Sequence, residues 1–416
     1  MKKSFIVLSI ILTIVFTAGT NGVVSEAAGN PHRVIVTLGD PINDNARSSL
    51  ENLGGKVLKE LPLINGLVVL LPSEAIVSDV GALAGVRAVE EDAIVFALAK
   101  PNGKPGNGGG GSTQPAETLE WGVDRIDADL AWSTSKGAAV KVAVVDTGID
   151  QDHQDLVSNL KGGVNFVSKS PAKPADPSKW NDDNGHGTHV AGTIAAADNE
   201  IGVLGVATEA NLYAVKVLDR NGSGYISDVI AGINWAVNND MDVVNMSLGS
   251  SSDVQALHDA VDAAYATGVV LVAAAGNSGD GNNATNNVSY PAKYSSVIAV
   301  GATASDDSIP SWSSDGEEVE FTAPGVSVRS AWNDGLYKII SGTSMASPHV
   351  AGTVALILAT AVPVDYDTDL DGAWDPAEVR IALQATADDL GSVGHDNFYG
   401  YGLVDAEEVA TGVQTN

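Results

Sequence analysis

Nearly continuous apolar runs recur along the chain after residue 115, and amphipathic stretches separate them. Buried on both faces, such runs form strands, which we place at 141–147, 211–218, 242–248, 269–276 and 297–303. The intervening segments have helical periodicity, at 189–197, 226–239 and 253–268. Doubly buried strands alternating with helices predict an α/β domain of three layers, a parallel sheet between two helical layers. Functional sites in such sheets gather beyond the carboxyl ends of the strands.

A smaller unit precedes this domain. Strand-like and helix-like segments follow one another in the order β-α-β-β-α-β over residues 33–98, with the last strand at 93–98. This order predicts a small ferredoxin-like α+β domain. Residues 100–115 are rich in Gly and Pro, which indicates a linker and a natural place for cleavage. We therefore place domain boundaries at 29–99, 100–115 and 116–416.

The first 28 residues have the pattern of a secretory signal peptide. Lys2 and Lys3 precede an apolar run at 5–16, and small residues follow at 25–27. A membrane anchor is the alternative, but the run is too short to span a bilayer comfortably. We expect residues 1–28 to be removed and the protein to be secreted and extracellular.

Composition narrows the possible partners. The chain has 416 residues and a formal net charge of −30, so nucleic acid, which is bound by neutralising phosphates, is not an expected partner. Cys is absent, so disulfides and thiolate metal sites are excluded.

Three residues have the chemistry of a nucleophile, a base and an orienting acid. Asp146 ends an apolar strand in "VVDTGID", His186 is framed by glycines in "NGHGTHVAG", and Ser344 opens an apolar helix in "GTSMASPHVAG". Each has a plainer interpretation: Asp146 as a turn stabiliser, His186 with His189 as metal ligands, and Ser344 as a helix N-cap. The His spacing is not that of zincins, and the order Asp, His, Ser favours an acyl-transfer triad.

These three segments together resemble the signature segments of the subtilisin-like serine proteases, and the similarity extends over roughly residues 117–410. The resemblance implies a subtilisin-like catalytic domain preceded by a propeptide that inhibits the enzyme and assists its folding. It implies that Ser344 attacks the peptide carbonyl, that His186 transfers the proton and that Asp146 orients His186. Autocatalytic cleavage of the zymogen is expected between Leu98 and Lys104. Protein or peptide substrates are the expected partners, and a monomer is the expected state.

The same resemblance assigns roles to further residues. Asn277, in "VAAAGNSG", matches the side chain that binds the developing oxyanion, although Asn-Ser-Gly is also an ordinary turn sequence. Two segments match those that pair with an extended substrate, and two serines match the specificity pocket. These substrate-binding residues are Gly222, Ser223, Gly224, Ser247, Leu248, Gly249, Ser278 and Ser289. Since neither pocket serine is charged, we expect broad specificity favouring large apolar residues before the cut.

Residues 367–378, "DTDLDGAWDPAE", repeat the formula of an EF-hand calcium loop. Calcium is the expected cofactor, held by carboxylates and one carbonyl, and the flanking helices should end near Val362 and begin near Pro376. The expected ligands are Asp367, Asp369, Asp371, Ala373, Asp375 and Glu378. The alternative is a helix start, with Asp375 as N-cap and Glu378 closing a capping box. That alternative leaves the three earlier aspartates unexplained.

A second calcium site is implied by resemblance alone. Residues 196–207 are similar to the tight calcium loop of the family, with a plain surface loop as the alternative. The implied ligands are Glu117, Asp155, Asn199 and the carbonyls of Ala197, Ile201 and Val203. Glu117 stands where the family commonly has Gln, and Gln154 where it commonly has Pro.

Other functions compete with a secreted serine endopeptidase. A carboxyl-type serine peptidase would not need "NGHGTH", and an esterase of the α/β-hydrolase type would have the order Ser, Asp, His. An inactive, protease-like binding module would be expected to lack at least one of Asp146, His186, Asn277 and Ser344, and all four are present.

Overall fold

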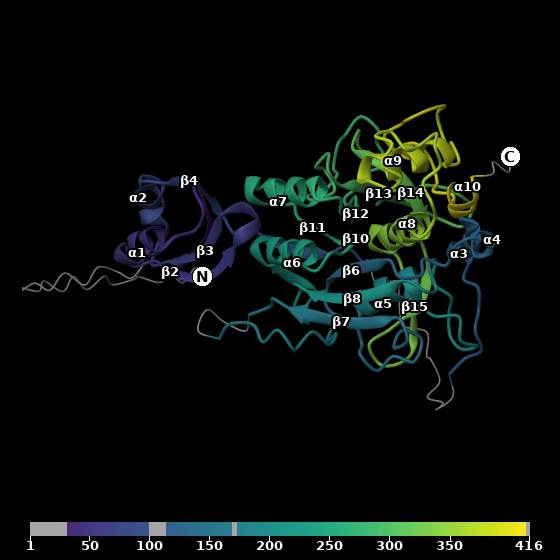
Figure 1. The fold of residues 1–416 in the computed structure, drawn as a ribbon, viewed down its shortest axis with the longest axis horizontal. Coiled ribbons are helices and arrows are strands. Elements are labelled where there is room, and N and C mark those ends of the chain that lie inside the picture. Colours follow the sequence, from purple (N-terminus) through teal and green to yellow (C-terminus); the bar gives the residue numbers. More distant parts are fainter. Residues whose placement is uncertain (1–30, 100–113, 169–172, 413–416) are drawn as a thin grey trace, which may run out of the picture.

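The computed structural model describes residues 31–99, 114–168 and 173–412, and places two domains against each other (Figure 1). We call residues 32–92 the N-terminal domain and residues 116–412 the C-terminal domain. The predicted signal peptide and most of the predicted linker lie outside the described residues. Among the helices in the described ranges, none is long and apolar enough to cross a membrane.

The N-terminal domain is a four-stranded antiparallel sheet in the order β2-β3-β1-β4. One face packs on its own helices, and the other joins a core shared with the C-terminal domain through Ile35, Leu61 and Val68. Its elements are β1 (His32–Leu38), α1 (Asp44–Asn52), β2 (Lys56–Leu61), η1 (Pro62–Ile64), β3 (Gly66–Leu71), η2 (Glu74–Ile76), α2 (Val77–Gly81) and β4 (Val86–Glu91).

The strand expected at 93–98 is present, but the prediction that it closes the small domain was wrong. The fourth strand of this sheet is β4, which sequence patterning missed because charged residues occupy half of its positions and none of its residues is buried. The apolar segment instead forms β5 (Ile94–Ala97), which leaves the domain. It inserts as the middle strand between β9 (Ser223–Tyr225) and β11 (Leu248–Gly249), antiparallel to both. Its apolar side chain Val95 is therefore buried against the C-terminal domain.

A seven-stranded parallel sheet forms the centre of the C-terminal domain, in the order β14-β13-β12-β10-β6-β8-β7. All five predicted strands are present, although each is somewhat shorter than its apolar run. The edge strands β7 and β14 were not predicted, because glycine or polar residues interrupt their apolar patterns. The bounds are β6 (Lys141–Asp146), β7 (Leu160–Asn165), β8 (Asn211–Lys216), β10 (Val243–Met246), β12 (Val270–Ala274), β13 (Ile298–Thr303) and β14 (Val319–Pro324).

Helices cover both faces of this sheet, as predicted. The core on one side contains α5 (His186–Ala195) and α8 (Thr343–Leu358), and the core on the other contains α6 (Ile226–Asn238) and α7 (Gln255–Ala266). Figure 1 shows α6 and α7 facing the N-terminal domain. Helix α8 ends at Leu358 rather than near Val362. The remaining elements are α3 (Trp121–Arg125), α4 (Ala128–Ala131), β15 (Val328–Ala331), β16 (Tyr337–Ile340), α9 (Pro376–Thr386) and α10 (Ala406–Thr411).

Candidate active site

Asp146 and His186 meet at the carboxyl end of the sheet. Asp146 is the last residue of β6, and His186 is the first residue of α5. His186 Nδ1 lies 2.8 Å from Asp146 Oδ1 and 2.9 Å from Oδ2, and both side chains are almost wholly buried. The other ring nitrogen, Nε2, has no hydrogen-bond partner among the described residues. A carboxylate therefore fixes one side of the imidazole and leaves the other available for a proton.

A second acid, which sequence reasoning missed, holds the loop before His186. Buried Asp182 accepts hydrogen bonds from the hydroxyls of Thr147 (2.9 Å) and Thr188 (2.6 Å) and from the Gly185 N–H (2.9 Å). Burial raises the pKa of the Asp182 carboxyl. A carboxylate with this many donors is a structural anchor, and its position in "NDDNGHGTH" carried no signal beyond its proximity to His186.

The neighbouring histidines are structural. Burial lowers the pKa of His189 to about 3, and its Nε2 contacts the carbonyl oxygens of Val328 and Lys338. Burial also lowers the pKa of His349 to about 4, and its Nδ1 contacts the Met345 carbonyl. A metal site built from His186 and His189 does not fit these contacts.

Ser344 lies in the first turn of α8, which follows Gly342. Its hydroxyl donates to the Ser247 carbonyl at 2.9 Å and makes no capping hydrogen bond. The interpretation of Ser344 as a helix N-cap was therefore wrong. Asn277 lies beside it, and its Oδ1 accepts a hydrogen bond from the Thr343 N–H at 3.0 Å. This contact fixes the amide plane and directs Nδ2 toward the cleft.

The peptide carbonyl of Leu98 occupies the space between these groups. Asn277 Nδ2 donates to it at 2.7 Å, and the Ser344 N–H lies 3.4 Å away. The Leu98 N–H donates to the Ser247 carbonyl at 3.3 Å, and the Ala97 N–H to the Gly222 carbonyl at 2.9 Å. A Cβ on Gly342 would lie 2.3 Å from this carbonyl oxygen, so only glycine allows the approach. The segment therefore binds as an extended peptide, by strand addition.

Comparison with known proteins identifies the family of the chain. Residues 137–402 match the subtilase family. The chain is 40% identical to subtilisin E of Bacillus subtilis over 417 aligned positions, which cover 98% of this chain and 99% of that protein. The chain belongs to the subtilase family. It is 50% identical to subtilisin DY of Bacillus licheniformis, over 71% of this chain and all of that one. It is 46% identical to an alkaline protease of Shouchella clausii, over 71% and 70% of the two chains. The molecule is thus a serine endopeptidase with a subtilisin-like α/β fold.

In this subtilase, the predicted substrate-binding segments flank β5 on both sides. Gly222, Ser223 and Gly224 lie on or beside β9, and Ser247, Leu248 and Gly249 lie on or beside β11. The Leu98 side chain approaches Gly249, where an added Cβ would lie 2.9 Å from Leu98 Cδ1 and equally far from Ser289 Cβ. Ser278 is exposed, and its N–H donates to the Ser314 hydroxyl at 3.2 Å.

The predicted tight calcium site includes an acid with an unsatisfied carboxylate oxygen. Asp155 Oδ2 accepts from the Val203 N–H at 3.0 Å, whereas buried Oδ1 has no partner among the described residues. Burial raises the pKa of the Asp155 carboxyl to about 6. Glu117 Oε1 accepts from the N–H groups of Asn199 (2.8 Å) and Glu200 (3.1 Å). A buried carboxylate oxygen without a partner, beside a loop rich in oxygen ligands, fits a hard cation.

Only three of the six expected ligands of the EF-hand-like loop cluster together. Asp367, Asp369 and Asp371 each bring one carboxylate oxygen within 4.8 Å of the others. Asp375 and Glu378 form the capping box of α9, and buried Glu378 also accepts from the Thr368 N–H at 2.6 Å. The Ala373 N–H donates to Asp371 at 2.7 Å. The three clustered aspartates fit the calcium-loop interpretation, whereas Asp375 and Glu378 form the helix start that was its alternative.

Proposed function

We propose that Ser344, His186 and Asp146 form the catalytic triad and that Asn277 binds the oxyanion. The Leu98 carbonyl carries this proposal, because two donors already point at it from the positions that a tetrahedral intermediate needs. Ser344 turns its hydroxyl from the Ser247 carbonyl toward the free His186 Nε2, which accepts the proton as the Ser344 Oγ bonds to the carbonyl carbon of the scissile peptide. Asp146 holds the tautomer and stabilises the imidazolium. His186 then returns the proton to the leaving amine, and water hydrolyses the acyl-enzyme.

The N-terminal domain is the inhibitory propeptide, and the Leu98–Ala99 bond is the processing site. This bond lies at one limit of the segment, Leu98 to Lys104, in which we expect the cut. The domain also supports folding of the C-terminal domain, since its acids complete two helices. Glu90 accepts from the N–H groups of Gln255 and Ala256 at the start of α7, and Asp92 accepts from the Ser227 N–H in α6. Carboxylates at helix N-termini satisfy orphan donors and oppose the dipole.

The test uses the full chain and its Ser344→Ala variant. A fluorophosphonate probe should label the processed wild-type protein and not the variant, and the mature chain should begin at Ala99. The variant should remain a full-length precursor. Labelling that persists in Ser344→Ala would exclude Ser344 as the nucleophile, and the same cut in that variant would assign processing to another protease. An unlabelled wild-type chain would favour an inactive binding module.

The proposed substrates are proteins or peptides with a large apolar residue before the cut. Leu98 supports this preference because its side chain lies against Gly249, which also lies beside the uncharged Ser289. A peptide library should give broad cleavage with Leu, Met, Phe and Tyr favoured, whereas a strict requirement for Arg or Lys would contradict the proposal. Secretion after removal of residues 1–28, and action as a monomer, complete the proposed function.

Calcium is the proposed stabilising ion. At the tight loop, Asp155, Glu117, Asn199 and the three backbone carbonyls would hold it, with the orphaned Asp155 oxygen as the supporting observation. At the EF-hand-like loop the three clustered aspartates would begin the coordination, joined by the Ala373 carbonyl, Asp375 and Glu378. An ion bound only to the folded protein raises its stability, so excess chelator should lower the melting temperature. An unchanged melt would contradict both sites.

A further inference from the structure

Asp228 lies in the first turn of α6, at the surface of the C-terminal domain that the N-terminal domain covers. Its side chain is only 5% exposed. Two cations of the N-terminal domain reach it: Lys59, which forms an ion pair with Oδ1, and Arg33, whose Nη2 lies 3.6 Å from the same oxygen. One buried carboxylate therefore receives two positive charges from the other domain.

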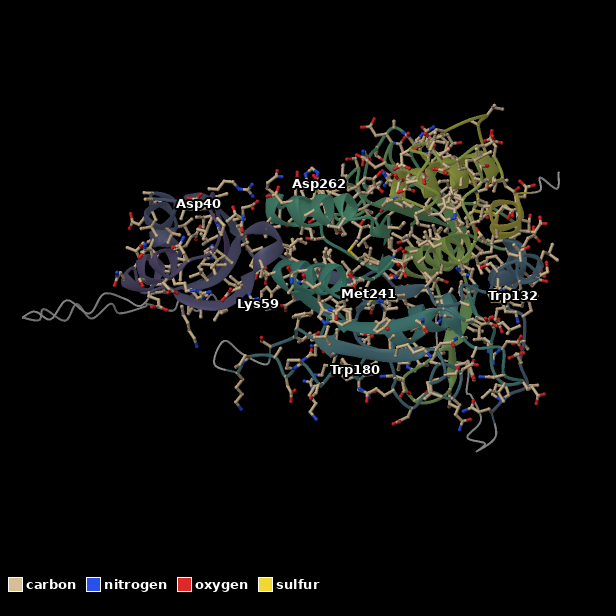
Figure 2. All side chains as sticks on the ribbon, in the orientation of Figure 1. Asp40, Lys59, Trp132, Trp180, Met241 and Asp262 are labelled. Carbon is tan, nitrogen blue, oxygen red and sulfur yellow. The ribbon has the colours of Figure 1, made fainter. Side chains whose placement is uncertain are left out.

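The C-terminal domain provides an aromatic ring and a hydrogen-bond acceptor for each cation. The Arg33 guanidinium stacks 4.0 Å from the ring centre of Tyr225, and its Nη2 donates to the Ser227 hydroxyl at 2.8 Å. Lys59 Nζ lies 5.3 Å from the ring centre of Phe166 and 3.4 Å from the carbonyl oxygen of that residue. Figure 2 labels Lys59 where the two domains meet. An aromatic ring beside each of the two cations suits a partner that presents two cations to Asp228.

The charges balance only when the domains are together. The N-terminal domain contributes Arg33, Lys59 and Asp92, which pairs with Arg33, and the C-terminal domain contributes Asp228. A buried charge that loses its partner is strongly unfavourable, so an inhibitor lacking these cations would bury Asp228 without compensation. By contrast, the Glu90 contacts are to backbone N–H groups, which any similar helix start presents.

We propose that Asp228, with Phe166 and Tyr225, is the site by which this protease recognises its own propeptide. It fits an inhibitory domain that places two converging cations against α6, and it rejects one that does not. This inference rests on the proposed zymogen function and adds to it the residue that sets inhibitor selectivity and the rate of release after processing.

The test follows activation of the full chain. After folding, gel electrophoresis reports cleavage of the precursor, and hydrolysis of a Leu-containing p-nitroanilide peptide reports departure of the cleaved N-terminal domain. The interval between them should shorten about tenfold or more in Lys59→Met and in Asp228→Asn, because each leaves the buried group of Arg33, Lys59, Asp92 and Asp228 with one uncompensated charge. Final activity per fluorophosphonate-titrated site should equal that of the parent. The double variant should be less affected than the sum of its parts, since the two residues contact each other.

Asp259→Asn is the matched control. Asp259 also pairs across the domains, with Arg87, but the Arg87 side chain is 50% exposed, so its loss should change the interval by no more than about twofold. Lys59→Met leaves the C-terminal domain unaltered, so it decides the question even where Asp228→Asn fails to fold. An interval in Lys59→Met equal to that of the parent or of Asp259→Asn would overturn the inference while leaving the triad intact. A parent chain that never cleaves itself would overturn the proposed function and this inference with it.

Discussion

Under the proposed function, Gly249 limits the space for the side chain before the cut, so Gly249→Ala should change specificity. The added Cβ would lie 2.9 Å from Leu98 Cδ1, whereas carbon atoms pack at about 3.5–4.0 Å. A leucine in this position must withdraw by about 0.6–1.1 Å, and Ser289, equally close on the other side, limits movement of the new methyl group. An alanine side chain ends short of this contact and should be accepted unchanged.

The magnitude follows from the apolar contact that is lost. One or two methylene groups in a hydrophobic pocket discriminate by about 1–3 kcal/mol, or about 10- to 200-fold. We therefore expect the ratio of kcat/KM for a peptide cleaved after Leu to one cleaved after Ala to fall by a factor in this range. The two peptides should be otherwise identical, and the active enzyme should be counted by fluorophosphonate titration.

The precursor supplies an internal control for this prediction. Gly249→Ala should slow cleavage at Leu98–Ala99, and adding Leu98→Ala should restore it, because the smaller side chain fits the smaller pocket. A Leu-to-Ala ratio equal to that of the parent would refute the assignment of Gly249 to the pocket. Equal slowing in the single and double variants would show that Gly249→Ala disturbs the β11 backbone instead.

Three further predictions concern the oxyanion, calcium and pH. Asn277→Ala should lower kcat by about 10²–10³, as loss of the corresponding donor does in subtilisin, with KM nearly unchanged in steady-state kinetics. Asp155→Asn should abolish most of the calcium-dependent rise in melting temperature, and Asp369→Asn should remove a separate part. The losses in the two variants should add in the double variant, and losses that do not add would mean that one ion serves both loops. Burial raises the pKa of the Asp405 carboxyl to about 7, so its charged form destabilises the fold as pH rises from 4 to above 7. The Asp405→Asn variant can still cap α10. Its free energy of unfolding, measured by denaturant titration, should exceed that of the parent by about 1–3 kcal/mol at pH 8 and by little at pH 4. A difference that does not change with pH would contradict this origin.

The residues of the proposed triad could be singled out from the sequence because each breaks a strong local pattern. An acid ends the apolar run at Asp146, glycines surround His186, and a hydroxyl opens the apolar helix at Ser344. The edge strands β7 and β14 were not predictable, since their residues lack the uniform burial of the central strands. The route of 93–98 was also missed, because its apolar pattern predicts burial without saying against which domain.

Ion pairs across the domains left no sequence signal at all. Arg33 and Lys59 have the spacing of ordinary surface cations, and Asp228 has that of an ordinary first-turn acid. Only the folded arrangement, in which the N-terminal sheet packs on α6, brings them together. The three aspartates of the EF-hand-like loop show the opposite case, since their local spacing alone was enough to predict that they cluster.

The two sides of the proposed processing bond are anchored at different places. Leu98 is held in the cleft, while the Pro115 carbonyl accepts from the Gly202 N–H and Ala116 bridges to Ile201, beside the tight loop. Hydrolysis would convert one tethered chain into two independent ends, so a resealing reaction would have to bring back together termini that no longer share a connection. Hydrolysis of this one bond would therefore be enough to make maturation irreversible, with water as the only other reactant.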